Sequence, residues 1–132
     1  MLYQWTQSGE PMDQVAEAFW RVRTTTDETR SRAEKLARGA CERVEAIDRR
    51  IQAASEHWRL DRIASVDLNI MRIAAYELMA EQETPVAVVL DEAVEMARRF
   101  GERDSPAFVN GVLDKVMREL KADEEAKRVR GI

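Results

Sequence analysis

The chain has 132 residues, a length typical of one domain with a substantial core. Its net charge is −4, with 45% hydrophobic and 35% charged residues, which fits a soluble, helix-rich globular protein. No apolar run approaches the roughly 20 residues that a membrane span requires, and the N-terminus lacks the pattern of a signal peptide. The single cysteine, Cys41, excludes an internal disulfide and fits a reducing cytoplasm.

Apolar residues at helical spacing run through the N-terminal half. Residues 1–9 are expected to form a short helix docked on the core, and Pro11 opens a second helix that reaches Arg23. One long helix is expected from about Asp27 to Trp58, because its apolar residues recur at steps of three and four. The predicted stripe comprises Ala33, Leu36, Ala40, Val44, Ile47, Ile51, Ala54 and Trp58.

After a short connector, the next predicted helix begins at Ser65, which is a suitable N-cap. Its apolar residues cover well over half of the circumference, so this helix is expected to be central, with neighbours on several sides. Glu77 falls near the apolar side and should therefore have a hydrogen-bonding partner. Pro85 opens a further helix that ends at Phe100.

The stretch from Gly101 to Leu120 contains a helix stop, a tight loop and a helix start. Gly101 is expected at positive φ just past the preceding helix, Ser105 as an N-cap and Pro106 at the first helical position. The stripe of the last helix comprises Val109, Val112, Leu113, Val116, Met117 and Leu120. The polar residues that follow are expected to fray.

Phe108 lies outside this stripe. At about 100° per residue, it lies roughly 120° from the centre of the stripe, and Asn110 lies roughly 80° away on the other flank. Two interpretations are open. Phe108 either packs on a second neighbour, as most large apolar residues do, or stays partly exposed beside a capped helix start, where it could stack on a nucleic-acid base.

The sequence contains no motif for catalysis. It has no glycine-rich phosphate loop, no GxSxG and no CxxC, and its one histidine and one cysteine give no metal-binding set. We therefore expect neither enzyme activity nor a cofactor. Between Arg72 and Arg98 there is no lysine or arginine, while six acidic residues fall there. This region is either an ordinary solvated surface or a patch that attracts a basic protein.

Several segments resemble the NusB family of bacterial transcription antitermination factors. They are V-D-L-N-I-M-R-I-A-A-Y-E-L from Val66, T-P-V-A-V-V-L-D-E-A-V-E-M-A-R-R-F-G from Thr84, and D-S-P-A-F-V-N-G-V-L-D-K-V from Asp104. The start L-Y-Q-W-T-Q-S-G resembles the first helix of the family. The resemblance covers about residues 1–120 and is most specific from Phe100 to Lys115.

The resemblance implies an all-α bundle of about six to seven helices in two packed subdomains. The boundaries expected are 1–56 and 57–121, followed by a polar tail at 122–132. It also implies binding to the boxA element of ribosomal RNA leader transcripts together with NusE, the small-subunit ribosomal protein that doubles as a Nus factor. The complex would join RNA polymerase in the cytoplasm and suppress termination.

The resemblance also implies which residues of this sequence form the RNA surface and the protein-binding surface. The RNA surface would comprise Tyr3, Asp104, Ser105, Phe108 and Asn110, with Arg99 and Arg103 as candidates for phosphate contacts. The surface facing NusE would comprise Asp67, Met71 and Glu77 on the central helix.

One departure from the family leaves alternatives open. Family members begin with an arginine-rich segment before L-Y-x-W, whereas Met1 stands directly before Leu2 here. Losing those phosphate contacts would lower RNA affinity and its salt dependence. The alternative function is a helical interaction or homodimer scaffold with weak or lost RNA binding. A third reading is a fragment of a ribosomal RNA cytosine methyltransferase, because NusB-like domains precede such enzymes.

Overall fold

The computed structural model describes Leu2, Trp5, Gln7, Gly9 and Glu10 together with residues 27–80 and 84–131. Every regular element in these residues is helical, which confirms the all-α prediction. The elements are α3 (Asp27–Glu42), α4 (Val44–Ala54), the 3₁₀ turn η1 (Leu60–Arg62), α5 (Ser65–Ala80), α6 (Val86–Phe100) and α7 (Ser105–Arg130). Leu2, Trp5 and Gln7 are helical, and the helix expected after Pro11 lies outside the described residues.

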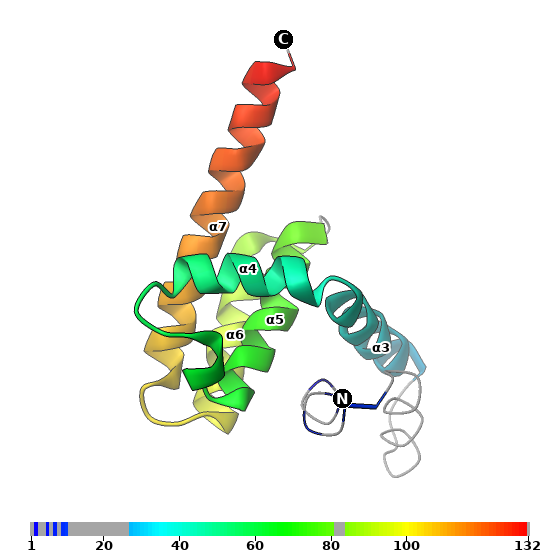
Figure 1. Ribbon diagram of the computed structural model, residues 1–132. Coiled ribbons are helices and arrows are strands. Elements are labelled where there is room, and N and C mark those ends of the chain that lie inside the picture. The colour runs from blue at the N-terminus through cyan, green and yellow to red at the C-terminus, as the bar shows by residue number, and fades with distance from the viewer. Residues whose placement is uncertain are drawn as a thin grey trace.

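Helix α5 is the centre of the bundle, as its sequence predicts. It packs against α3, α4, α6 and α7, and α4 crosses its face (Figure 1). Met71 and Ala75 have no exposed surface. Helices that touch four neighbours need apolar side chains around most of their circumference, which accounts for the broad apolar pattern of α5. One core cluster extends from Ala40 in α3 to Val116 in α7, and the division at residues 56 and 57 stays a prediction.

The long helix expected from Asp27 to Trp58 is wrong, because the chain leaves helical geometry at Arg43, with φ −114° and ψ 18°. The break divides the predicted stripe between α3 and α4. A straight helix could not keep the whole stripe against α5, whereas the bend allows α3 to pack on α5 and α4 to pack on both α5 and α7. Neither glycine nor proline stands at the break, so the residues around Arg43 carry no ordinary signal of a helix end.

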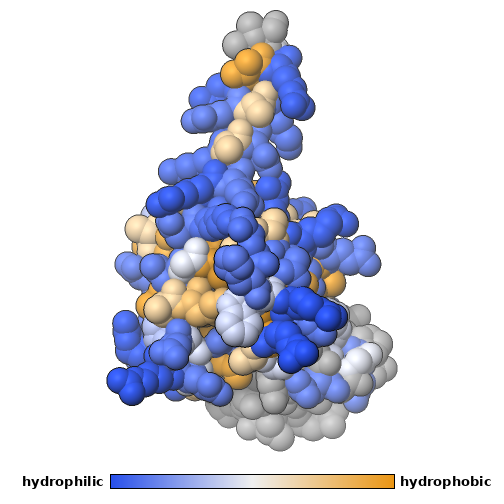
Figure 2. Space-filling model, turned by 60° about the vertical axis from the view of Figure 1, so that its left-hand side comes forward, coloured by the Kyte–Doolittle hydropathy of each residue, from blue (hydrophilic) through white to orange (hydrophobic). Residues whose placement is uncertain are grey.

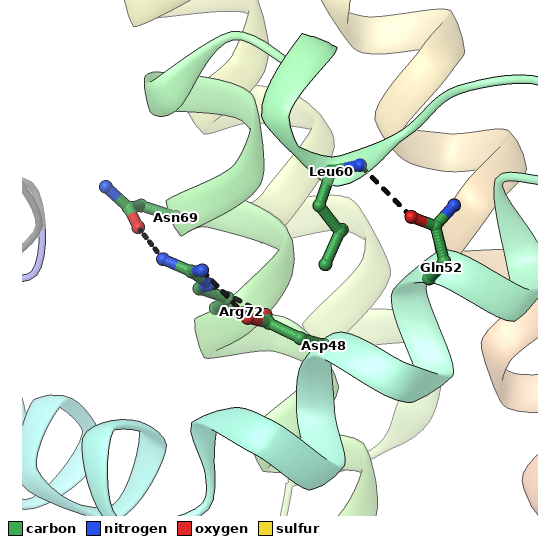
Figure 3. A network of polar contacts seen from close by, with 5 residues as sticks. All are labelled: Asp48, Gln52, Leu60, Asn69 and Arg72. Atoms are coloured by element: carbon green, nitrogen blue, oxygen red, sulfur yellow. Dashed lines mark hydrogen bonds and ion pairs between the residues drawn. The ribbon is translucent and has the colours of Figure 1, made fainter.

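A partly buried ion pair joins α4 to α5. The Arg72 guanidinium donates to both carboxylate oxygens of Asp48 at 2.9 Å and to Asn69 Oδ1 at 3.2 Å (Figure 3). The side chains of Arg72 and Asp48 are only 11% and 20% exposed. A two-point contact of this kind sets the angle between two helices as well as their separation.

The turn after α4 is held by side chains from α4 itself. Gln52 Nε2 donates to the Trp58 carbonyl at 2.8 Å, and the Leu60 N–H donates to Gln52 Oε1 at 3.1 Å (Figure 3 shows the Leu60 bond). Ser55 Oγ donates to the Ile51 carbonyl at 2.8 Å, at the end of the helix. Trp58 was predicted to continue the buried stripe, and this prediction is wrong. It lies in the turn with 55% of its surface exposed.

The turn between α6 and α7 differs from its prediction in two respects. Gly101 has φ −93°, so it does not adopt the left-handed conformation. Glycine is needed there because a Cβ would lie 2.6 Å from Ser105 Cβ and 2.8 Å from the Ala97 carbonyl oxygen. Asp104 holds the N-cap position of α7 without a side-chain cap bond, and Ser105, which was expected there, is the first residue of the helix. The Ser105 hydroxyl accepts from the Glu102 N–H at 2.9 Å, which closes the turn.

Helix α7 continues through the tail that was expected to fray. It has 26 residues and ends at Arg130. Its C-terminal half projects beyond the other helices (Figure 1) and has a mostly hydrophilic surface (Figure 2). Arg50 of α4 pairs with Asp123 at 2.5 Å, which ties the first turn of the extension to the bundle. Among the described residues no helix combines the length and apolarity needed to cross a membrane.

Two glycines in helices give a matched test of the packing of α3 on α5. A Cβ at Gly39 would lie 2.2 Å from Tyr76 Cζ, whereas a Cβ at Gly111 in α7 would have nothing within 4 Å. Gly111→Ala should raise the free energy of unfolding by about 1 kcal/mol through helix propensity. Gly39→Ala should lower it by about 1 kcal/mol, because displacement of the Tyr76 ring outweighs the same gain. Urea denaturation measures both, and equal stabilisation would contradict the close approach.

Candidate nucleic-acid interface

A cleft of about 250 Å³ opens where the turn after α4 meets the starts of α5 and α7. Two stretches far apart in sequence meet there: residues 58–67, which lead into the first turn of α5, and residues 102–108, which lead into the first turn of α7. The lining residues are Trp58, Arg62, Ile63, Ala64, Asp67, Glu102, Asp104, Ser105 and Phe108. The cleft thus combines two aromatic rings with acidic, basic and hydroxyl groups.

The environment of Phe108 combines the two interpretations of its position outside the apolar stripe, namely packing on a neighbour and partial exposure. The residue is partly buried and packs against the main core, yet it also lines the cleft. Val109 beside it is fully buried and belongs to the predicted stripe. The ring is therefore anchored on the bundle while part of it remains accessible to a ligand.

Asp67 and Ser105 form the buried polar pair of the cleft. Ser105 Oγ donates to Asp67 Oδ2 at 2.9 Å and so links α5 to the start of α7. Asp67 is 7% exposed and Ser105 is 4% exposed. The assignment of Ser105 to the RNA surface stays a prediction, and the structure places Ser105 in the wall of the cleft. Its hydroxyl is occupied by two internal hydrogen bonds and holds the turn that positions Phe108.

The other residues predicted for the RNA surface do not all share the cleft. Asp104 lines it and is exposed. Arg99, Arg103 and Asn110 are exposed but do not line it, and Arg99 Nε lies 3.2 Å from Glu95 Oε1. Tyr3 lies outside the described residues.

Gln7, near the N-terminus, nevertheless comes close to the cleft. Gln7 Nε2 donates to Ser65 Oγ at 3.5 Å, and Ser65 directly follows the cleft residue Ala64. Gln7 therefore lies beside the start of α5.

A second, larger hollow lies between α3, α5 and α6. This apolar groove has a volume of about 610 Å³. Met96 and Phe100 on its α6 side are 45% and 61% exposed. Glu77 and Glu92 give the groove an acidic component, and Arg32 lies 3.6 Å from Glu77 Oε2. This contact is an ion pair and is too long for a hydrogen bond, so the hydrogen-bonding partner expected for Glu77 stays a prediction.

The three residues predicted to face a protein partner do not form one surface. Asp67 lines the cleft, Glu77 lines the groove, and Met71 has no exposed surface. The prediction that Met71 contacts a partner is therefore wrong, because its side chain fills the core between helices. Residues that are apolar and lie on the crowded helix of a bundle are usually core residues.

The two hollows are lined by apolar, aromatic, carboxylate and hydroxyl groups, with Arg62 in the cleft. The described residues contain no cluster of three or more His, Cys, Asp and Glu side chains that could hold a metal ion. Burial raises the pKa of the Cys41 thiol to about 11, while the positive charge of Arg72 acts in the opposite direction. The thiol is therefore protonated at neutral pH and is a poor nucleophile. The chemistry available is that of binding: stacking, hydrogen bonding and ion pairing.

Trp58 and Arg62 were missed as site residues by sequence reasoning. Trp58 fitted the apolar stripe of the expected long helix, so it was assigned to the core. The signal that could have shown the end of the helix was Ser55. Serine can close a helix by bonding the carbonyl four residues earlier, as Ser55 does with Ile51.

Comparisons with known proteins agree on one family. The sequence profile of the NusB family matches residues 1–118. The chain is 44% identical over 120 residues to the transcription antitermination protein NusB of Sorangium cellulosum (strain So ce56), covering 91% of this chain and 86% of that protein. The structure of T. maritima NusB superposes with a TM-score of 0.79 at 33% identity, covering 89% of this chain and 83% of that chain.

A solved complex is also similar. The crystal structure of antitermination factors NusB and NusE with double-stranded RNA contains a chain that is 25% identical to this one. The TM-score is 0.78, and the match covers 89% of this chain and 88% of that chain.

Proposed function

Because this chain belongs to the NusB family of transcription antitermination proteins, which are not enzymes, we propose that it binds RNA together with NusE. The RNA target in this proposal is the boxA element of ribosomal RNA leader transcripts. The complex then joins RNA polymerase and suppresses termination. The support from relatives is the solved complex of NusB and NusE with RNA.

The observation that carries the RNA part is the accessible Phe108 ring in a cleft at the start of α7. Proteins recognise single-stranded RNA largely by stacking unpaired bases on aromatic side chains. Asp104 adds a hydrogen-bond acceptor at the same place. Arg99, Arg103 and Asn110 are exposed nearby in sequence and supply groups for phosphates and sugars, and Tyr3 is proposed to extend this surface.

The protein partner is proposed to bind along α5 and α6. These helices carry the acidic stretch that contains no lysine or arginine from residue 73 to 97. Glu77 lines the groove, whereas Asp67 lines the cleft that also contains Phe108, so Asp67 is proposed to lie where the protein surface meets the RNA surface. An acidic surface along α5 and α6 favours the approach of a basic ribosomal protein.

Phe108→Ala is the direct test of the RNA site. Loss of one stacking ring should weaken binding of boxA RNA in the presence of NusE by about tenfold, because base–aromatic stacking contributes roughly 1–3 kcal/mol per base. Val129→Ala is the control, since Val129 is 72% exposed in the projecting part of α7 and lines neither the cleft nor the groove. Fluorescence anisotropy with boxA and scrambled RNA at two salt concentrations measures both, and circular dichroism checks the fold.

A second candidate function rests on the apolar groove. Met96 and Phe100 expose apolar surface beside it, which favours a protein-interaction module or a homodimer. If wild-type protein with NusE binds boxA no better than scrambled RNA, the RNA proposal is rejected. Sedimentation over a concentration series then tests self-association, and Phe100→Asp should shift the chain toward monomer if the groove forms the dimer interface.

A further inference from the structure

We propose that the apolar groove between α3, α5 and α6 receives the projecting end of α7 from a second copy of this chain. Two features of the structure carry the inference. One is the groove itself, and the other is the C-terminal extension of α7, residues 121–130, all of which are exposed. The inference names the element that fills the groove in the second candidate function, and it does not depend on the proposed RNA binding.

The first argument is the form of the groove. Its walls run along α5 from Val66 to Glu77 and along α6 from Val89 to Phe100, so each wall is about 16 Å long at a rise of 1.5 Å per residue. Met96 and Phe100 leave much of their apolar surface exposed in it. A groove between helices with these properties accepts an amphipathic helix, which lays its apolar face on the floor.

The second argument is the pattern of the extension. Ala122, Ala126 and Val129 are exposed and lie on one side of α7, because they are four and three residues apart. Figure 2 shows apolar side chains along this otherwise hydrophilic part of the molecule. Helices that bind in grooves use anchors at this spacing. The extension is about 14 Å long by the same rise per residue, so its length matches that of the groove.

The third argument is charge. Glu77 and Glu92 line the half of the groove nearer the α5–α6 connection, and no lysine or arginine is among the lining residues. Glu92 is exposed and has no ion pair among the residues that the structure describes. The last turn of α7 is basic, and Arg130 directly follows the anchor Val129. With the end of α7 in the acidic half of the groove, Arg130 meets Glu92.

The helix that fills the groove comes from another copy, because the extension projects away from the bundle of its own chain (Figure 1). A contact between two different surfaces closes when two copies exchange their helices, so we expect a symmetric dimer with two equal contacts. NusE is proposed to bind along the same two helices, α5 and α6. It should therefore displace the second copy, which leaves Val129 free in the complex with RNA.

Sedimentation velocity of the full chain over a concentration series gives the dissociation constant of the dimer. Val129→Asp should raise this constant at least about tenfold, because the contact would then bury a carboxylate against apolar side chains. Val88→Asp is the matched control, since Val88 is 41% exposed on α6 but does not line the groove. The control should associate as wild type does, and circular dichroism checks that both variants are folded.

A charge exchange tests the orientation of the helix in the groove. Glu92→Arg and Arg130→Glu should each raise the dissociation constant about tenfold, because like charges then face each other. An equal mixture of the two variants should associate as wild type does, since each groove then meets a helix end of opposite charge. Glu124→Arg is the control, because Glu124 lies on the side of α7 opposite the apolar line at about 100° per residue.

Three results overturn the inference. The first is a wild-type chain that stays monomeric at every concentration. The second is association that Val129→Asp leaves unchanged, which shows that copies meet through another surface. The third is a mixture of the two charge variants that stays dissociated. These measurements contain neither RNA nor NusE, so their failure leaves the proposed RNA binding in place, and failure to bind boxA leaves this inference in place.

Discussion

Replacing Arg72 with methionine should lower the free energy of unfolding by about 3 kcal/mol, since removing one partner of a buried ion pair typically costs 3–5 kcal/mol and this pair is partly exposed. Methionine keeps much of the side-chain volume but removes the guanidinium that bonds Asp48 and Asn69. The Asp48 carboxylate is then left 20% exposed without its cation. Urea denaturation of the variant gives the change directly.

A double-mutant cycle isolates the pair. Asp48→Asn in the Arg72→Met background should cost much less than Asp48→Asn alone, because the unpaired carboxylate is the main penalty. Arg59→Met is the matched surface control, since Arg59 and Asp61 pair at 3.1 Å while 78% and 61% exposed. Its expected cost is below about 1 kcal/mol. Equal losses for Arg72 and Arg59 would show that the α4–α5 pair contributes no more than a surface contact.

Ser105→Ala should lower the free energy of unfolding by about 2 kcal/mol and weaken RNA binding as well. The change leaves the Glu102 N–H without its acceptor and Asp67 Oδ2 without its donor. Unsatisfied buried groups cost roughly 1–3 kcal/mol, and more when they are charged. RNA affinity should fall because the turn that carries Asp104 and leads to Phe108 loses its closing bonds.

Ser31→Ala serves as the control for this change, because Ser31 is exposed in α3. It should leave both stability and RNA affinity within error of wild type. If Ser105→Ala destabilises the chain without changing RNA affinity, the turn does not contribute to the RNA site. Unchanged stability would contradict the buried hydrogen bonds themselves.

The helices around α5 could be predicted because their apolar spacing is regular and their ends carry strong signals. The broad apolar pattern of α5 predicted its central position, and Pro85 and Pro106 lie close to the starts of α6 and α7. The break at Arg43 could not be predicted, because the apolar spacing continues through it without glycine or proline. It arises from packing of both halves on α5, which is a tertiary effect.

The site was predicted in part. The angular position of Phe108 relative to its stripe predicted a ring with a separate environment, and the structure places it in the cleft. The role of Ser105 was not predictable, because its partner Asp67 is 38 residues away in sequence. Trp58 was misassigned for a related reason: helical spacing alone cannot show that the helix has already ended at Ala54.

Helix α5 supplies residues to both hollows of the protein. Asp67 belongs to the cleft, whereas Val66, Asn69 and Ile70, from the same turns, belong to the groove. A ligand that displaces α5 from the side of one hollow therefore also moves the α5 residues that line the other hollow. Thermodynamic linkage makes such an influence mutual, so occupancy of either hollow would change the affinity of the other by the same factor.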